Sequence, residues 1–385
     1  MKSLILKLMF LPLFFLFCNA TEIKVGMSAD FTKSVSYIGE NMKKGIETYF
    51  YKHNKNSKNQ YKLISYDDNY NPILASKYTK RLIFDDKVNA ILGSVGTPTA
   101  NVVLPIIKEN KIPFIGAYSG GNILRNKENQ YVFNFRASYT QESYAITKKL
   151  LSLGLSVKDI AVFSQNDTYG DSGYFGVLKA ILEEKNVSSS SLAHERYTKD
   201  TLNIELGLSK LLDWNNDFKA IIIVGVNKAT AKFIEYAKED FPNAKFFLLS
   251  PINVKQIVKE LPSFKDDIYS TQILPALSNK NKLKLIDEFK VDYENKFGLK
   301  DYNLISFEGY LVAKLFILSI EKDGIDISRD SIYKALSDLR DFDIGLGFKS
   351  DFNNMNSQYS NKVWISKVND NFELVSISGD DIFRR

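Results

Sequence analysis

Histidine and cysteine, which supply many of the nucleophiles, bases and metal ligands of enzymes, are scarce in this chain. Its 385 residues include two histidines and one cysteine. His53 and His194 lie in polar stretches, and Cys18 belongs to the first 20 residues. The patterns H-E-x-x-H, C-x-x-C, G-x-x-x-x-G-K-[ST] and G-x-G-x-x-G do not occur. We therefore expect no catalytic residues, no cofactor and no metal, with an enzyme as the less favoured alternative.

After residue 20 no apolar run approaches the length of a membrane span. The one long apolar run is at the N-terminus, "LILKLMFLPLFFLFCNA", and it predicts a signal peptide over residues 1–20 that is cleaved after Ala20. A lipoprotein anchored at Cys18 fits less well, because Phe17 precedes it where a small residue is wanted. An uncleaved anchor is a further alternative. We expect export to the periplasm.

The mature chain also lacks disulfides and a strong charge. Residues 21–385 contain no cysteine, which favours a large hydrophobic core that is stable without disulfide bonds. The formal net charge of +6 falls to +4 when the two lysines of the signal peptide are removed. The basic residues are scattered, so we expect no nucleic-acid partner. The length predicts two domains.

What the chain does have is a regular alternation of strand and helix patterns. Short apolar segments predict strands at residues 22–30, 61–69, 88–96, 112–118, 159–167, 189–197, 218–227 and 244–251. Amphipathic segments between them predict helices at 39–55, 71–86, 97–110, 142–155, 170–186, 202–215 and 228–241. Two long helical patterns follow residue 280, and residues 362–377 predict a β-hairpin that turns at Asn369-Asp370. We predict two consecutive α/β halves, each built on a parallel sheet covered on both faces.

The loops after the predicted strands are the candidate site, because ligands of doubly wound sheets bind beyond the carboxyl ends of the strands. The segment "GSVGTPTANVVLP" is the most specific of them. Gly93 and Gly96 permit close approach of a ligand to the backbone, Ser94 and Thr97 offer hydroxyls, and the following helix offers free N–H groups. Such a loop suits a carboxylate, although a capped helix that binds nothing is the alternative. "GAYSGGN" repeats this chemistry after the next strand.

The tetrapeptide Gly170-Asp171-Ser172-Gly173 is the one that surrounds the nucleophile of trypsin-like serine proteases. Here it follows an apolar strand and opens a helix, and the strand-end loops contain no histidine to act as a base. We interpret Asp171 and Ser172 as first-turn and capping residues of that helix.

Several segments occur in an order that resembles type I periplasmic binding proteins. They are "IKVGMSADFT", "SYDDNYNP", "ILGSVGTPTA", "IPFIGAYSGG", "FNFRASY" and "IAVFSQNDTYGDSG". The chain is most similar to the leucine/isoleucine/valine, or branched-chain amino acid and amide, receptors of ABC importers. The resemblance implies an α/β fold of two Rossmann-like lobes with parallel-sheet cores, joined by three crossovers and closing over a ligand. Lobe 1 would comprise residues 21–137 and 271–345, and lobe 2 residues 138–270 and 346–385.

The resemblance also implies a set of ligand-binding residues. The loop that holds the ligand's carboxylate corresponds to Ser94, Val95, Gly96 and Thr97. The next loop, which meets the polar head of the ligand, corresponds to Tyr118, Ser119 and Gly120. Tyr169 matches the tyrosine of the cleft.

The chain departs from the amino-acid receptors on its second lobe. Ile252 stands where an acid commonly pairs with the ligand's ammonium, and Asn227 stands in a loop that would otherwise offer an aromatic residue or an acid. This puts an α-amino acid in doubt and leaves open a carboxylate or amide without an ammonium, or an aromatic acid stacked on Tyr169. If the ligand does carry an ammonium, Asp30 or Asp167 would be its partner.

These observations predict an exported, monomeric solute-binding protein. It would capture a small polar metabolite bearing a carboxylate and deliver it to the membrane subunits of an ABC importer. One alternative is a periplasmic sensor that reports occupancy to a membrane kinase or chemoreceptor. The others are an enzyme and a structural exported protein with an empty cleft.

Overall fold

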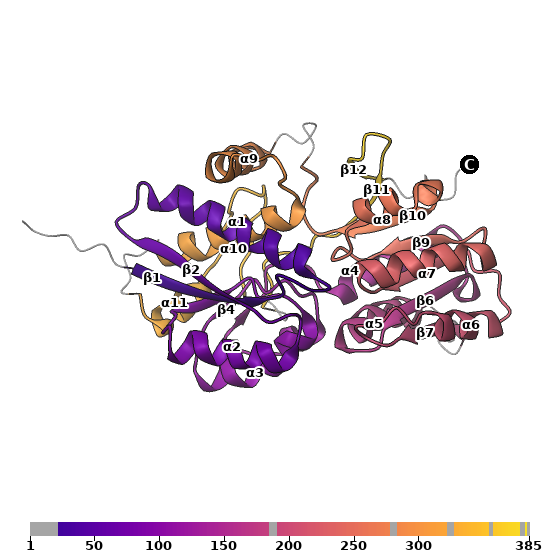
Figure 1. The fold of residues 1–385 in the computed structure, drawn as a ribbon, viewed down its shortest axis with the longest axis horizontal. Helices are drawn as coiled ribbons and strands as arrows, with labels where there is room; N and C mark the ends of the chain where they lie inside the picture. Colours follow the sequence, from indigo (N-terminus) through magenta and orange to yellow (C-terminus); the bar gives the residue numbers. More distant parts are fainter. Residues whose placement is uncertain are drawn as a thin grey trace, which may run out of the picture.

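The computed structural model describes residues 22–184, 191–277, 283–321, 327–353, 357–377 and 382. The predicted signal peptide and the outer ends of several predicted elements lie outside these residues. The described elements form two lobes that lie side by side, each with its own sheet (Figure 1). No helix in this described part of the chain is long and apolar enough to cross a membrane.

The first lobe contains a five-stranded sheet in the order β2-β1-β3-β4-β5, with every pairing parallel. The strands are β1 (Glu22–Ala29), β2 (Gln60–Asp67), β3 (Ala90–Leu92), β4 (Phe114–Ile115) and β5 (Val132–Phe133). On one face the core involves α1 (Ser36–Asn54), α9 (Lys284–Phe297), α10 (Leu304–Glu321) and α11 (Arg329–Ser337). On the other it involves α2 (Pro72–Phe84), α3 (Thr97–Glu109) and the short helix η1 (Asn122–Arg125). Both faces of the sheet are thus covered, as parallel sheets require.

The second lobe contains a seven-stranded sheet in the order β12-β11-β10-β9-β8-β6-β7. Its parallel strands are β6 (Ile160–Gln165), β7 (Ala193–Tyr197), β8 (Ala220–Val224), β9 (Lys245–Leu248) and β10 (Ile268–Gln272). The predicted C-terminal hairpin forms β11 (Trp364–Val368) and β12 (Leu374–Ser376), and β11 pairs antiparallel with β10. On one face pack α4 (Tyr139–Ser152) and α5 (Thr168–Leu182); on the other pack α6 (Glu205–Asp213), α7 (Asn227–Asp240) and α8 (Val254–Glu260). The short helices η2 (Val157–Asp159) and η4 (Pro262–Asp267) complete this lobe.

The chain crosses between the lobes three times. The first crossing joins β5 to α4, and the second follows β10, whose partners are strands of the second sheet. Leu346, Phe352 and Tyr359 are buried in the core of the first lobe, and the next strand, β11, belongs to the second sheet. We therefore place the third crossing between Tyr359 and Trp364, later than the residue-345 boundary expected from the sequence.

Candidate functional site

A cavity lies between the lobes and is lined by loops of both. Its volume is about 530 Å³, including space open to solvent. Four buried tyrosines form much of its wall: Tyr70, Tyr118, Tyr139 and Tyr169. Val35, Ile38, Val95 and Val226 add apolar surface. The cavity is thus an aromatic box with polar groups at a few points.

On the first lobe, the loop between β3 and α3 is shaped around Gly96. Its φ of +106° is a conformation that side chains rarely adopt, and a Cβ here would lie 2.5 Å from the ring of Tyr70. Gly96 therefore lets Tyr70 pack against the start of α3. Thr97 is the first residue of α3, and its hydroxyl lies 2.8 Å from the hydroxyl of Ser119.

On the second lobe, Asp167 positions Tyr169. The Asp167 carboxylate accepts hydrogen bonds from the N–H groups of Tyr169 and Gly170, at 2.9 and 3.1 Å, and so caps α5. The Tyr169 ring packs edge-on against Tyr139, with centroids 4.7 Å apart, and its hydroxyl donates to the carbonyl of Gly225 at 3.3 Å. These contacts hold the ring as a wall of the cavity.

No Asp, Glu, Lys or Arg is among the described residues that line the cavity. The two carboxylates considered as partners for an ammonium have other roles. Asp30 accepts the N–H groups of Thr32, Lys33 and Val35 at 2.6–2.9 Å, and Asp167 caps α5. Burial raises the pKa of all four wall tyrosines above its usual value, so their hydroxyls stay protonated.

The structure brings six of the ten predicted site residues to this cavity: Val95, Gly96, Thr97, Tyr118, Tyr169 and Asn227. The other four do not line it. The Ser94 hydroxyl accepts the N–H of Ser28 at 3.2 Å, and the Ser119 hydroxyl accepts the N–H of Gly121 at 3.1 Å. The carbonyl of Gly120 accepts the N–H of Tyr139, and Ile252 is buried in the core of the second lobe.

Of the four wall tyrosines, Tyr70 and Tyr139 were not among the site residues predicted from the sequence. Tyr70 lies in the predicted strand-end loop "DDNYNP", so its position after β2 was the available signal. Its φ of +57° turns the backbone into the left-handed region, which the sequence did not indicate. Tyr139 begins the first helix after a crossing, and it ends the segment "FNFRASY" that contributed to the family resemblance, which was the available signal.

Ser172 does not cap its helix, contrary to the interpretation from sequence, because Asp167 occupies the cap position five residues earlier. The Ser172 hydroxyl donates to the carbonyl of Thr168 at 2.8 Å and accepts the N–H of Asn122, in the other lobe, at 3.2 Å. It therefore joins the lobes beside the cavity. Asp171 is in the first turn of α5, as predicted, and pairs with Arg196.

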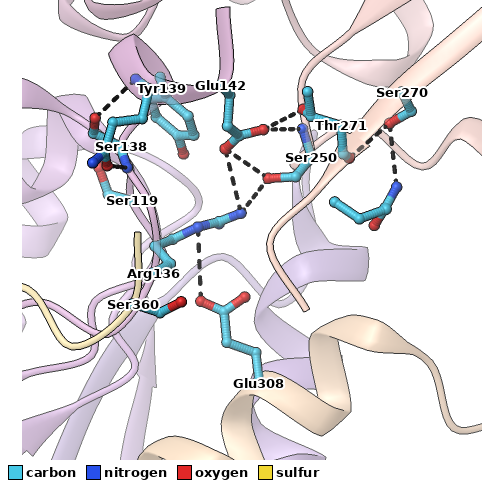
Figure 2. A network of polar contacts seen from close by, with 12 residues as sticks. Ser119, Arg136, Ser138, Tyr139, Glu142, Ser250, Ser270, Thr271, Glu308 and Ser360 are labelled. Atoms are coloured by element: carbon cyan, nitrogen blue, oxygen red, sulfur yellow. Dashed lines mark hydrogen bonds and ion pairs between the residues drawn. The ribbon is translucent and has the colours of Figure 1, made fainter. Parts of the chain in front are cut away.

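Behind the cavity, Arg136 of the first crossing contacts groups of both lobes (Figure 2). Its guanidinium lies 4.1 Å from the ring centroid of Tyr118 and 3.7 Å from Glu308 of α10. On the side of the second lobe it contacts Glu142 and the hydroxyl of Ser250. Burial raises the pKa of Glu308 to about 7, and the attraction of Arg136 opposes this rise.

Glu142 extends the network to the second crossing. Its carboxylate accepts the N–H and the hydroxyl of Ser250, at 2.8 and 2.9 Å, and the hydroxyl of Thr271 at the end of β10. Arg125 links the first crossing to the residue just before the third, because it donates to the carbonyl of Arg136 at 2.8 Å and to Gln358 at 2.6 Å. All three crossings therefore share one buried polar network next to the wall of the cavity.

Two α/β lobes that are joined by three crossings and enclose a cavity define a two-lobed ligand-binding protein. Comparison by sequence agrees: residues 22–373 match the family model described as periplasmic binding protein. The chain belongs to this family, among the type I proteins that resemble leucine/isoleucine/valine-binding proteins. No match was found among curated proteins.

Solved structures show the same fold. A possible leucine/isoleucine/valine-binding protein from Rhodopirellula baltica SH 1 is 33% identical, with 95% of this chain and 99% of that chain covered and a TM-score of 0.89. A fatty acid ABC transporter substrate-binding protein from Thermomonospora curvata is 17% identical, with 93% and 92% covered and a TM-score of 0.80. A branched chain amino acid ABC transporter from Thermus thermophilus with bound valine is 15% identical, with 94% and 96% covered and a TM-score of 0.79.

Proposed function

We propose that this chain is an exported substrate-binding protein that captures a small carboxylate without a free ammonium and delivers it to an ABC importer. The tyrosine-walled cavity between the lobes, with no charged side chain among its described lining residues, is the observation that carries this proposal.

The carboxylate is assigned to the start of α3. Gly96 and Thr97 line the cavity, and the first N–H groups of a helix have no partner inside it. These groups and the positive end of the helix dipole favour an anion. On the opposite lobe, Val226 and Asn227 place the start of α7 at the same cavity, where a second acceptor such as a carbonyl oxygen would be held.

An ammonium would find no counter-charge among the described lining residues. A buried charge without a counter-charge loses its hydration and gains no ion pair in return. Asp30 and Asp167 are engaged with backbone N–H groups, and the wall tyrosines stay protonated. Among the solved structures of this fold, one is described with bound valine and another as a fatty acid transporter protein. Both ligands are carboxylates and only valine has an ammonium, so the fold accommodates either class.

Capture would proceed by closure of the lobes over the ligand. Groups of the first lobe, at Gly96, Thr97 and Tyr118, would bind first, and Tyr169 and the start of α7 would close over the other side. Contacts with both lobes favour the closed form, because a ligand shifts a conformational equilibrium by its difference in affinity for the two states.

The test compares leucine with 4-methyl-2-oxopentanoate, which replaces the ammonium of leucine by a carbonyl oxygen. We expect calorimetry on the mature chain, refolded to remove bound ligand, to show at least tenfold tighter binding of the oxo acid. Equal or tighter binding of leucine would refute the ammonium argument. Lack of binding by any aliphatic or aromatic carboxylate would overturn the proposed ligand class.

Delivery to an importer is tested separately by uptake of the labelled ligand into cells with and without the gene for this chain. We expect uptake to fall when the gene is deleted. Unchanged uptake together with altered chemotaxis or gene expression would identify a sensor, and conversion of the ligand by the purified protein would identify an enzyme.

A further inference from the structure

A second cavity adjoins the tyrosine-walled one along the groove between the lobes. Tyr37 and Pro251 line both, so the two spaces meet at these residues. The second cavity has a volume of about 900 Å³, including space open to solvent. It is formed by residues 250–255, which lead into α8, on the second lobe and by the segment from Tyr302 to Ile305 on the first.

Two contacts between the lobes border the tyrosine-walled cavity elsewhere. Lys199 of the second lobe lies 4.4 Å from the ring centroid of Tyr70 and donates to its carbonyl at 3.3 Å. The contact between Asn122 and Ser172 joins the lobes at a second point. Tyr37 is 37% exposed. Because Tyr37 and Pro251 line both cavities, a ligand too long for the first cavity would reach the second by passing these two residues.

The polar groups of the second cavity are mostly engaged with the protein. Asn303 accepts the N–H groups of Ile305 and Ser306 at the start of α10, and Asn253 accepts the N–H of Gln256 at the start of α8. The hydroxyl and N–H of Ser250 are bonded to Glu142. The apolar surface offered to a ligand comes from Ile252, Val254, Leu277, Leu304, Ile305 and Leu374.

The two charged residues of this cavity, Lys255 and Glu373, are exposed at its rim. They carry opposite charges and interact electrostatically with each other. A ligand end that reaches them would meet solvent and little net charge.

We propose that the ligand is an elongated carboxylate whose apolar acyl or aryl chain passes between Tyr37 and Pro251 and occupies the second cavity. This inference rests on the proposed function and specifies its substrate class. It also gives Ile252 a role: its side chain faces an apolar chain in the second cavity, although it does not line the first.

The test measures the affinity of the mature chain for butanoate, hexanoate, octanoate and decanoate by calorimetry. We expect affinity to rise roughly fourfold per added methylene once the chain enters the second cavity, the effect of burying one methylene. Equal affinity along the series would overturn the inference. Binding of short carboxylates with no gain from length leaves the proposed function standing, and binding of none refutes that function, so the two failures are distinguishable.

A variant separates the second cavity from the first. Leu304 is half-buried at the start of α10 and lines only the second cavity, so Leu304→Trp fills that space. We expect decanoate to bind at least tenfold more weakly and butanoate to be unaffected. The matched control, Ile73→Trp on the exposed face of α2, should leave both unchanged. Equal losses for short and long ligands in Leu304→Trp would contradict the assignment.

Discussion

Replacing Arg136 by Met should destabilise the protein much more than breaking a shorter ion pair on its surface. Arg136 lies 3.7 Å from Glu308, and the two side chains are 1% and 3% exposed. Arg196 lies only 2.6 Å from Asp171, but these side chains are 33% and 56% exposed. Judged by distance, the surface pair should contribute more to stability; judged by burial, the Arg136–Glu308 pair should contribute more.

Burial outweighs distance here. An exposed pair contributes about 0–1 kcal/mol, because water screens the charges. Removing one partner of a buried pair costs about 3–5 kcal/mol, because the remaining charge is left without compensation. Glu142 keeps its bonds to Ser250 and Thr271 when Arg136 is lost, whereas Oε1 of Glu308 has no hydrogen bond among the described residues. Glu308 should therefore account for most of the loss.

The assay is urea unfolding of the ligand-free chain at pH 7.5 and pH 5.5. We expect Arg136→Met to lose about 3–5 kcal/mol at pH 7.5 and the control Arg196→Met at most about 1 kcal/mol. The stability lost in Arg136→Met should be smaller at pH 5.5. The folded pKa of Glu308 is raised to about 7, so at pH 5.5 its carboxyl binds a proton and no longer needs a counter-charge. The double variant Arg136→Met/Glu308→Gln should recover part of the stability. A loss in Arg136→Met no larger than in Arg196→Met, or a double variant less stable than the single one, would refute the reasoning.

Three further predictions concern the cavity and its surroundings. Tyr169→Ala should weaken ligand binding at least tenfold by calorimetry, since loss of an aromatic contact costs about 1.5 kcal/mol; unchanged affinity would remove Tyr169 from the site. Gly96→Ala should weaken binding and lower the melting temperature, because its Cβ would lie 2.5 Å from the Tyr70 ring at a φ of +106°; wild-type values in both assays would contradict this shape of the loop. His194, whose pKa burial lowers from 6.5 to about 4, binds a proton more readily in the unfolded chain, so its contribution to stability is lost as pH falls from 6.5 to 4. In His194→Phe the fall in stability between pH 6.5 and 4 should be smaller than in the wild type. An identical pH profile would contradict this contribution of His194.

The fold was largely predictable from sequence because most of its strands are apolar and its helices amphipathic. β8, with the sequence "AIIIV", is buried at every position and was predicted. β10, with the sequence "IYSTQ", is equally buried and was not. Its polar residues are satisfied by contacts that depend on the tertiary fold, such as the bond from Thr271 to Glu142, 129 residues away. A local pattern cannot indicate such a partner.

The sequence predicted which loops form the site better than it predicted which of their side chains face the cavity. The position of the loops follows from the strand ends, which brought Thr97, Tyr118 and Tyr169 to one cavity. Which side chains face that cavity depends on contacts between loops. Ser119, for example, is drawn toward Thr97 and Gly121, and Ile252 packs into the second lobe.

The bonds of Arg125 and Gln358 have a mechanical consequence. Arg125 ties the first crossing to Gln358, one residue before the third, and Gln358 in turn donates to Gln141 at the start of α4, 2.9 Å away. The neighbouring Glu142 accepts the hydroxyl of Thr271, just before the second crossing. Three stretches of chain fastened to each other at one place behave as a single pivot, with one rotational degree of freedom in place of three separate flexible tethers. Opening and closing then follow one coordinate, and fluorescent labels on any pair of sites across the two lobes should report the same time constant.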